Sequence, residues 1–244
     1  MTDTGGTTSP LAWARWAGLL YLAIITFGLF GELFVRSALI VHGDAAATAG
    51  NIANAPGLFR AGFLADSVMV LSDVALAVLL YILLRPVSRV VALMAMCFRL
   101  AQSAVLALNL LNYHAAGMLL DGSGHGAGFG TGQRDALAYF FLDLHTNGYD
   151  LGLLLFGIHC LLLGYLIYRA GYLPRLLGVL VSAAGFAYLI GGYTRFLFPD
   201  YVAAVSPVYI VAIVSEVSLC LWLLIKGVDM RQWERLTGSS AAVI

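Results

Sequence analysis

Six long apolar stretches constrain this chain more than any other feature of its sequence. Each is long enough to cross a hydrocarbon layer of about 30 Å as a helix. The apolar runs are continuous rather than alternating, and an isolated spanning strand would leave its backbone groups without partners. The sequence therefore predicts an all-α, polytopic membrane protein with six transmembrane helices, at residues 13–37, 60–84, 90–116, 149–169, 174–196 and 206–226.

The composition agrees with this prediction and indicates the lipid bilayer as a partner. Of the 244 residues, 61% are hydrophobic and only 11% are charged, whereas a soluble domain carries about 25% charged residues. The lipid bilayer is thus the expected surrounding. Thirteen basic residues balance thirteen acidic ones, which provides no basic footprint for a nucleic acid. No cofactor is predicted.

Basic residues gather on one side of the six predicted helices, and they predict the orientation of the chain. Because basic residues concentrate in cytoplasmic connections, we expect both termini in the cytoplasm. The residues on this side are Arg15, Arg85, Arg89, Arg169, Arg175, Lys226, Arg231 and Arg235.

The connections on this side are very short, at residues 85–89 and 169–175. Short connections make consecutive helices antiparallel neighbours, which predicts three helical hairpins. We expect residues 1–11 to form a polar cytoplasmic leader, residues 12–228 the membrane domain and residues 229–244 a cytoplasmic tail.

The connections on the other side are longer. Residues 40–58 are predicted to hold a short interfacial helix that starts after Asp44 and ends before Pro56. Residues 122–132 have glycine at every second position and read as a flexible loop. Residues 133–145 place apolar side chains on one helical face, which suits a helix lying in the membrane interface.

A carboxylate, Glu216, stands in the middle of the last apolar stretch. A charge at the bilayer centre costs about 2.5–3.5 kcal/mol on insertion scales, so it is rarely kept without a partner or a function. Residues of three other helices are predicted at similar depth, and Arg99 is the expected charge partner of Glu216. Together they form a candidate buried polar cluster of Asp73, Arg99, Gln102, His159 and Glu216.

A second polar group is predicted nearer the outer surface. Glu32 and Arg36 are four residues apart, which is the favourable order for an ion pair on one helix. His42, His114, His125 and His145 are interpreted as interfacial or loop residues. The outer polar group consists of Glu32, Arg36, Asp66, Asn109, Asp150 and Arg195.

Three uses of these buried groups remain open. The charges could pair off and serve structure alone, as in a membrane sensor or scaffold. They could line an outward-facing polar cavity that handles a small solute or an ion. Asp73, His159 and Glu216 could also act as metal ligands or as an acid–base set in a membrane-embedded hydrolase, although the sequence has no HExxH or comparable paired-ligand spacing.

Several segments resemble a known family. They are "ARWAGLLYL", "GDAAATAGNIANAPGLFR", "LHTNGYDLGLLLFGIHCLLLGYLIYRAGYLPRLLGVL" and "EVSLCLWLLIKGV", and they are similar to the bacterial membrane family called domain of unknown function 4386. The resemblance covers residues 12–230 and is most specific over residues 144–180. It implies a six-helix integral protein of the bacterial inner membrane, and it transfers no activity or catalytic residues.

Overall fold

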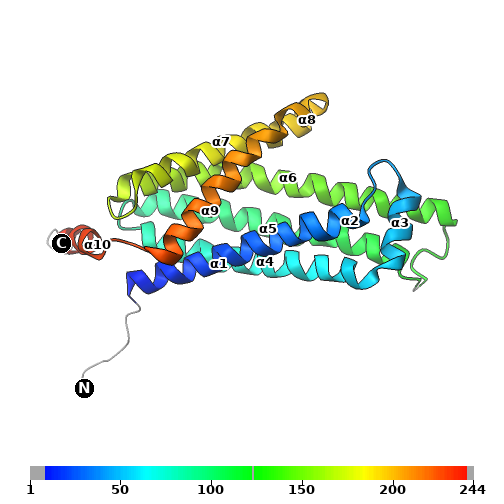
Figure 1. Ribbon diagram of the computed structural model, residues 1–244, viewed down its shortest axis with the longest axis horizontal. Coiled ribbons are helices and arrows are strands. Elements are labelled where there is room, and N and C mark those ends of the chain that lie inside the picture. The colour runs from blue at the N-terminus through cyan, green and yellow to red at the C-terminus, as the bar shows by residue number, and fades with distance from the viewer. Residues whose placement is uncertain (1–8, 123, 241–244) are drawn as a thin grey trace, which may run out of the picture. The chain divides into compact units, whose positions relative to one another are not determined.

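A computed structural model describes residues 9–122 and 124–240 of the chain. Within these ranges the chain is helical and contains no strand (Figure 1). Residues 1–8 of the predicted leader and 241–244 of the predicted tail lie outside the described residues. The elements are α1 (Pro10–Phe30), η1 (Gly31–Arg36), α2 (Ser37–Leu39), α3 (Ala45–Asn54), α4 (Pro56–Leu84), α5 (Arg89–Leu120), α6 (Thr131–Ala170), α7 (Arg175–Leu197), η2 (Pro199–Tyr201), α8 (Val202–Val205), η3 (Ser206–Val208), α9 (Tyr209–Ile225) and α10 (Met230–Ser240).

Six helical segments in the described residues are long and apolar enough to cross a membrane, which confirms the predicted number. They are Pro10–Leu39, Pro56–Leu84, Arg89–Leu120, Thr131–Ala170, Arg175–Leu197 and Pro199–Ile225. The fourth differs from the prediction, because residues 133–145 are not a separate interfacial helix. They begin a continuous helix of 40 residues. No proline interrupts its hydrogen bonds, and the Thr146–Asn147–Gly148 stretch is too weak a breaker to end it.

The short helix α3 forms as predicted. The Asp44 side chain accepts a hydrogen bond of 2.8 Å from the backbone N–H of Ala47, and this bond satisfies one of the open donors at the start of the helix. The helix ends at Asn54, directly before the Ala55–Pro56 step. A cap at one end and a proline beyond the other therefore define its length.

The described helices group into two compact units. Unit 1 comprises the described residues of Met1–Leu22, Val74–Leu100 and Leu154–Ile244, and unit 2 comprises those of Ala23–Asp73 and Ala101–Leu153. Helices α1, α4, α5 and α6 contribute residues to both units.

In unit 1, α6 and α7 approach each other through glycines. A Cβ atom on Gly157 would lie 3.0 Å from the carbonyl oxygen of Gly185, and one on Gly164 would lie 2.6 Å from that of Gly178. The pairing runs in opposite directions along the two helices, so α6 and α7 are antiparallel in this unit. Glycines allow such close backbone contact between membrane helices.

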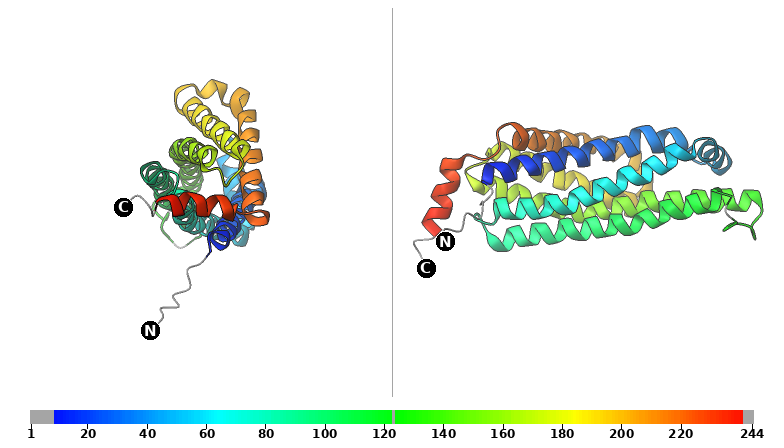
Figure 2. Two further views of the ribbon diagram at one scale, coloured as in Figure 1. Left: turned by 90° about the vertical axis from the view of Figure 1, so that its left-hand side faces the viewer. Right: turned by 90° about the horizontal axis from the view of Figure 1, so that it is seen from below.

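The loop between α6 and α7 is held by Tyr172. Its hydroxyl donates a hydrogen bond of 2.6 Å to the carbonyl oxygen of Leu83, and its ring packs edge-on against Trp233 of α10 at 5.1 Å. Burial raises the pKa of the Tyr172 phenol. Figure 2 shows α10 turned steeply away from the direction of α9, and Tyr172 provides the contact that holds it there.

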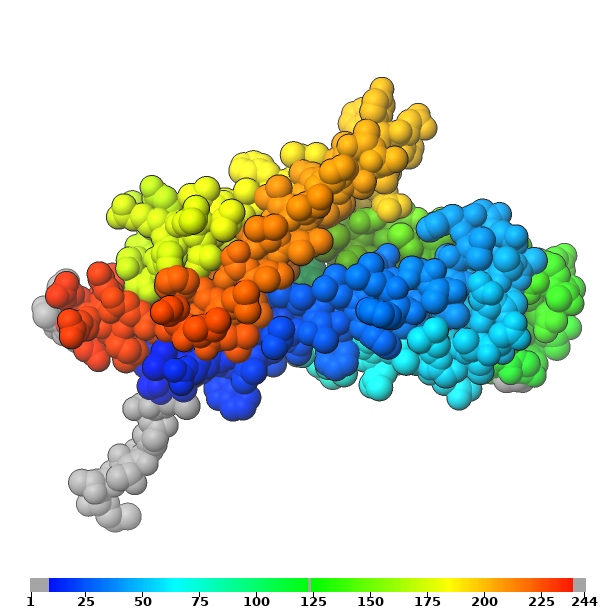
Figure 3. Space-filling view, viewed as in Figure 1, coloured from blue at the N-terminus to red at the C-terminus, as the bar shows by residue number. Residues whose placement is uncertain are grey.

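Helices α7 and α9 of unit 1 lie side by side and meet at the α8 turn (Figure 1). Figure 3 shows α9, in orange, as part of the surface. Its exposed side chains are mainly apolar. Large exposed side chains on that helix include Ile210, Ile213, Val214 and Leu221. An apolar outer surface suits a lipid surrounding, because apolar side chains are not in contact with water there.

In unit 2, the core forms where α4 and α5 pack against each other. The rings of Phe59 and Tyr113 stack with centroids 4.1 Å apart, and the Tyr113 hydroxyl donates a hydrogen bond of 2.8 Å to the carbonyl oxygen of Phe59. Both side chains belong to a cluster of buried residues that also contains Val35, Leu39, Ile52, Ala116, Ala138 and Leu142.

Candidate functional site

Arg99 and His159 form a hydrogen-bonded pair inside unit 1. Both side chains are almost completely buried, and Nη1 of Arg99 lies 3.0 Å from Nε2 of His159. Nδ1 of His159 lies 2.8 Å from the carbonyl oxygen of Ala95. A carbonyl oxygen only accepts, so Nδ1 carries the ring proton and Nε2 accepts from Arg99. The imidazole is therefore neutral and has a defined tautomer.

Aromatic rings surround the Arg99 guanidinium. Its central carbon lies 5.4 Å from the ring centroid of Tyr21 and 5.1 Å from that of Phe156. Phe156 also stacks on the His159 ring at 5.5 Å. Such cation–π contacts contribute about 2 kcal/mol or more each when the cation is desolvated. The rings thus stabilise a positive charge where no water is expected.

Glu216 belongs to the same unit, and its bonding partner is a tyrosine. The Tyr188 hydroxyl donates a hydrogen bond to Oε1 of Glu216, and the Tyr188 ring packs edge-on against Phe156 at 5.2 Å. Tyr21 lies within electrostatic range of both Glu216 and Arg99. Unit 1 thereby collects an arginine, a neutral histidine, a carboxyl group and two phenols from five helices, α1, α5, α6, α7 and α9.

The other two members of the predicted buried cluster lie in unit 2. Asp73 accepts a hydrogen bond of 2.6 Å from the Ser103 hydroxyl. Gln102 is buried, and its Oε1 has no hydrogen-bond partner among the described residues. The direct pairing of Arg99 with Glu216 stays a prediction. The sequence did not predict the roles of Tyr21, Phe156 and Tyr188. An aromatic residue within an apolar stretch looks the same whether it contacts lipid, another apolar side chain or a charged group.

The outer polar group also divides between the units. Arg195 lies in the last turn of α7 in unit 1, and the other five residues belong to unit 2. There Nε of Arg36 donates to Glu32 at 2.7 Å, which is the predicted pair, and Nη1 donates to Oδ2 of Asp66 at 2.8 Å. One guanidinium therefore binds two carboxylates, one on its own helix and one on α4.

His145 is the residue that the sequence analysis misplaced. It does not lie in a loop: it is buried in α6, with Nε2 lying 3.8 Å from Oδ2 of Asp66. The signal lies in the spacing of His145 and His159. Positions i and i+14 differ by only about 40° around a continuous α-helix, so the two histidines share a face once residues 131–170 form one helix.

Asn109 connects the backbone of α6 to α5. Its Nδ2 donates a hydrogen bond of 2.7 Å to the carbonyl oxygen of His145, and its Oδ1 accepts one of 2.9 Å from Asn112. A Cβ atom on Gly148 would lie 2.6 Å from Cγ of Asn109, so this contact requires glycine. Asp150, further along α6, is also buried.

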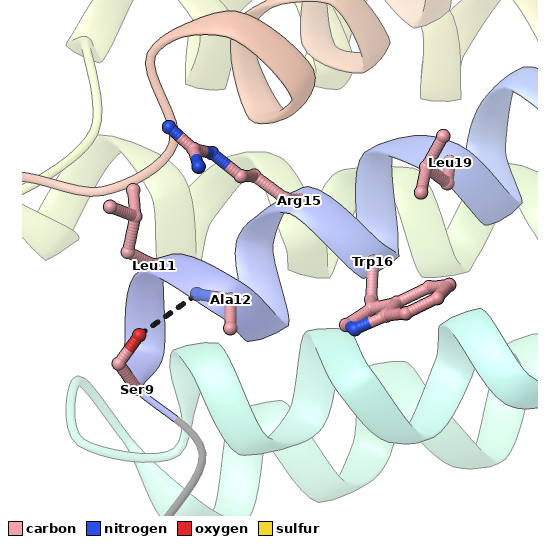
Figure 4. A pocket seen from close by; sticks show the side chains of 6 residues that line it. All are labelled: Ser9, Leu11, Ala12, Arg15, Trp16 and Leu19. Carbon is pink, nitrogen blue, oxygen red and sulfur yellow. Dashed lines mark hydrogen bonds between the residues drawn. The ribbon is translucent and has the colours of Figure 1, made fainter.

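No group of three or more His, Cys, Asp or Glu side chains in the described part of the chain is placed to hold a metal ion. A hollow of about 210 Å³ lies at the start of α1 (Figure 4). It contains none of the predicted site residues, and its lining is mainly apolar. The lining residues are Ser9, Leu11, Ala12, Arg15, Trp16 and Leu19.

Six apolar helices with ionisable side chains held in their interior define a multi-pass membrane protein. A family model described as a domain of unknown function, DUF4386, matches residues 16–227. The chain belongs to this family. It is also 31% identical over 159 residues to an uncharacterized protein of Archaeoglobus fulgidus, a match that covers 65% of this chain and 79% of the relative. No solved structure matches the chain.

Proposed function

We propose that this membrane protein handles a small solute or an ion, with Arg99, His159 and Glu216 as its central groups. The observation that supports this most is the convergence of five helices of unit 1 on buried ionisable side chains. Ionisable residues within membrane helices are expensive, and they commonly mark pathways for ions, protons or substrates.

The hydrogen bonds of these groups leave Arg99 positively charged and allow Glu216 to bind and release a proton. His159 is neutral and accepts from Arg99, so the guanidinium keeps its positive charge beside it. Glu216 is bonded to a phenol, which donates to the carboxylate and leaves the carboxyl group able to take up a proton. An arginine and a carboxyl group held in one apolar unit offer a binding point for an anion and one for a proton or cation.

The location and orientation are part of the proposal. We place the protein in the cytoplasmic membrane, with both termini in the cytoplasm and a polar entry route from the outer face. The arginine-rich connections at residues 85–89 and 169–175 support this orientation through the positive-inside tendency.

Two alternatives keep some support. A membrane-embedded hydrolase or metal enzyme would use Asp73, His159 and Glu216, but the described residues lack a group of metal-binding side chains. A sensor or scaffold with purely structural ion pairs is favoured by the Glu32–Arg36–Asp66 arrangement, in which both carboxylates bind one guanidinium.

Electrical recording from proteoliposomes on a solid-supported membrane tests the proposal. The purified chain is exposed to a panel of inorganic cations, inorganic anions, amino acids, carboxylic acids and sugars. We expect at least one solute class to produce a current that protein-free liposomes lack. Glu216→Gln should reduce this current at least about tenfold, the loss that corresponds to about 1.4 kcal/mol.

The matched control is Glu234→Gln, the same change at an exposed position of α10, which should leave the current unchanged. A folded wild-type protein that gives no current with any class contradicts solute handling. A current that Glu216→Gln leaves intact contradicts the assignment of Glu216 to the site.

A further inference from the structure

The first membrane segment changes its helical form where its charges lie. Residues Gly31–Arg36 form a π-helix, in which the N–H of Ser37 bonds to the carbonyl oxygen of Glu32. The π form is rare and occurs mostly as single turns inside α-helices, frequently at functional sites. Here it contains the Glu32–Arg36 ion pair, and the Arg36 guanidinium also binds Asp66.

Two carboxyl groups share one guanidinium at this place. Arg36 binds Oε2 of Glu32 at 2.7 Å and Oδ2 of Asp66 at 2.8 Å. The group therefore has a formal net charge of −1 when His145 is neutral. The Glu32 side chain is 67% exposed, whereas the side chains of Asp66 and His145 are 3% and 4% exposed. Arg36 and Asp66 thus balance each other in the buried part, and the excess negative charge of the group lies on the exposed Glu32.

One carboxyl oxygen of Asp66 is available to bind a proton. Its Oδ1 is buried and has no hydrogen-bond partner among the described residues, while Oδ2 serves Arg36 and faces the His145 ring. A Cβ atom on Gly31 would lie 2.9 Å from this Oδ1 and 3.1 Å from Nη2 of Arg36. Glycine at the start of the π-helix therefore leaves the room that the carboxyl group occupies.

We propose that Asp66 and His145 form a site that binds one proton, held jointly by the pair beside Arg36. The proton lies on the imidazole or on the carboxyl group. In either position it brings the summed formal charge of Glu32, Arg36, Asp66 and His145 to zero. Two groups this close titrate as a pair rather than separately. The site uses none of Arg99, His159 and Glu216, so it goes beyond the proposed solute handling and does not depend on it.

Other titratable groups face this pair from each helix packed against it. Glu32 and Arg36 come from η1, and Tyr113 comes from α5, with its ring edge-on to His145 at 5.4 Å. Tyr149, on α6 itself, lies within electrostatic range of Arg36. Arg36 is the positive charge beside the pair, and Glu32 is the second carboxylate bound to that guanidinium.

Nuclear magnetic resonance of the histidine ring nitrogens, with infrared difference spectra of the carboxyl groups, tests this site in the detergent-solubilised full chain. Over a pH titration the wild type should take up one proton at the pair, with the His145 signal identified by its loss in His145→Gln. An opposite charge within a few ångströms raises the proton affinity of a histidine by about one pH unit or more. Asp66→Asn should therefore weaken proton binding at His145 at least about tenfold, and Asp200→Asn, at an exposed position, should not.

A second pair of variants retains every titratable group. Gly31→Ala places a methyl group against Oδ1 of Asp66 and should shift the midpoint of the pair, whereas Gly50→Ala, where a Cβ meets nothing within 4 Å, should leave it unchanged. This comparison decides the matter if Asp66→Asn does not fold. A His145 midpoint that is the same in wild type, Asp66→Asn and Gly31→Ala overturns the proposal, as does a wild type in which neither group takes up a proton.

Discussion

Glu216 shows how one side chain in an apolar helix obtains a polar partner. The carboxyl group accepts a hydrogen bond from Tyr188, a residue of the neighbouring helix α7. A phenol combines a large apolar ring with a single polar tip. Tyr188 can therefore pack against Phe156 and still donate to Glu216, without adding a further charge to the interior.

Tyr188→Phe tests this contact at the scale of one atom. The change keeps the ring and removes the donor, so the carboxyl group of Glu216 loses the hydrogen bond from this phenol. We expect the free energy of unfolding to fall by about 1–3 kcal/mol, measured as a lower melting temperature in detergent. Tyr193→Phe, the same change at an exposed position of α7, is the control. Equal melting temperatures for the two variants would contradict a contribution of the bond to stability.

Helices α6 and α7 use glycine wherever their backbones meet. The contact residues Gly157 and Gly164 are seven apart on α6, and their counterparts Gly178 and Gly185 are seven apart on α7. A seven-residue step returns to nearly the same side of a helix, so each helix presents a smooth strip to the other. Close backbone packing replaces the hydrophobic driving force that lipid does not supply.

Gly164→Ala is predicted to damage this strip. The added Cβ would lie 2.6 Å from the carbonyl oxygen of Gly178 and would also meet the Ser182 hydroxyl. The contact is with backbone, which cannot rotate away, so the helices must separate. We expect a loss of about 1–3 kcal/mol, visible as a lower melting temperature. Gly132→Ala, also on α6 but with open space around the new atom, should not destabilise the protein. The prediction is wrong if both variants melt like the wild type.

At the scale of the whole molecule, both compact units hold buried or partly buried ionisable groups. Arg99, His159 and Glu216 belong to unit 1, and Arg36, Asp66 and His145 belong to unit 2. Each set is built from residues of its own unit. A protein in which buried charge served only one structural ion pair would not need a second set with a π-helix and a buried histidine.

The orientation of the chain in the membrane is tested by cysteine labelling of intact cells, on a background in which the free cysteines Cys97, Cys160 and Cys220 are replaced. A cysteine at Ser88 or Glu234 should resist an impermeant thiol reagent, because these positions follow the cytoplasmic orientation predicted by the basic residues. A cysteine at Gly128, an exposed loop position with open space around it, should react. Ser123 of the same loop lies outside the described residues. Labelling at Ser88 without labelling at Gly128 would reverse the orientation.

The sequence by itself determined the all-helical membrane class, the number of spanning segments, the Asp44 cap and the Glu32–Arg36 pair. These features depend on local properties, namely the length of apolar runs, side chains three or four residues apart, and the residue before a helix. Such properties can be read along the chain without knowledge of its packing.

Only the tertiary structure decided which helices supply the partners of each charge. Asp66 binds Arg36 across two helices, and His145 enters the same group because residues 131–170 form one uninterrupted helix. Glu216 is bonded to a tyrosine whose sequence surroundings are wholly apolar. In an interior without water each polar group must find a partner on whichever helix lies beside it, and that neighbour depends on packing between segments far apart in the chain.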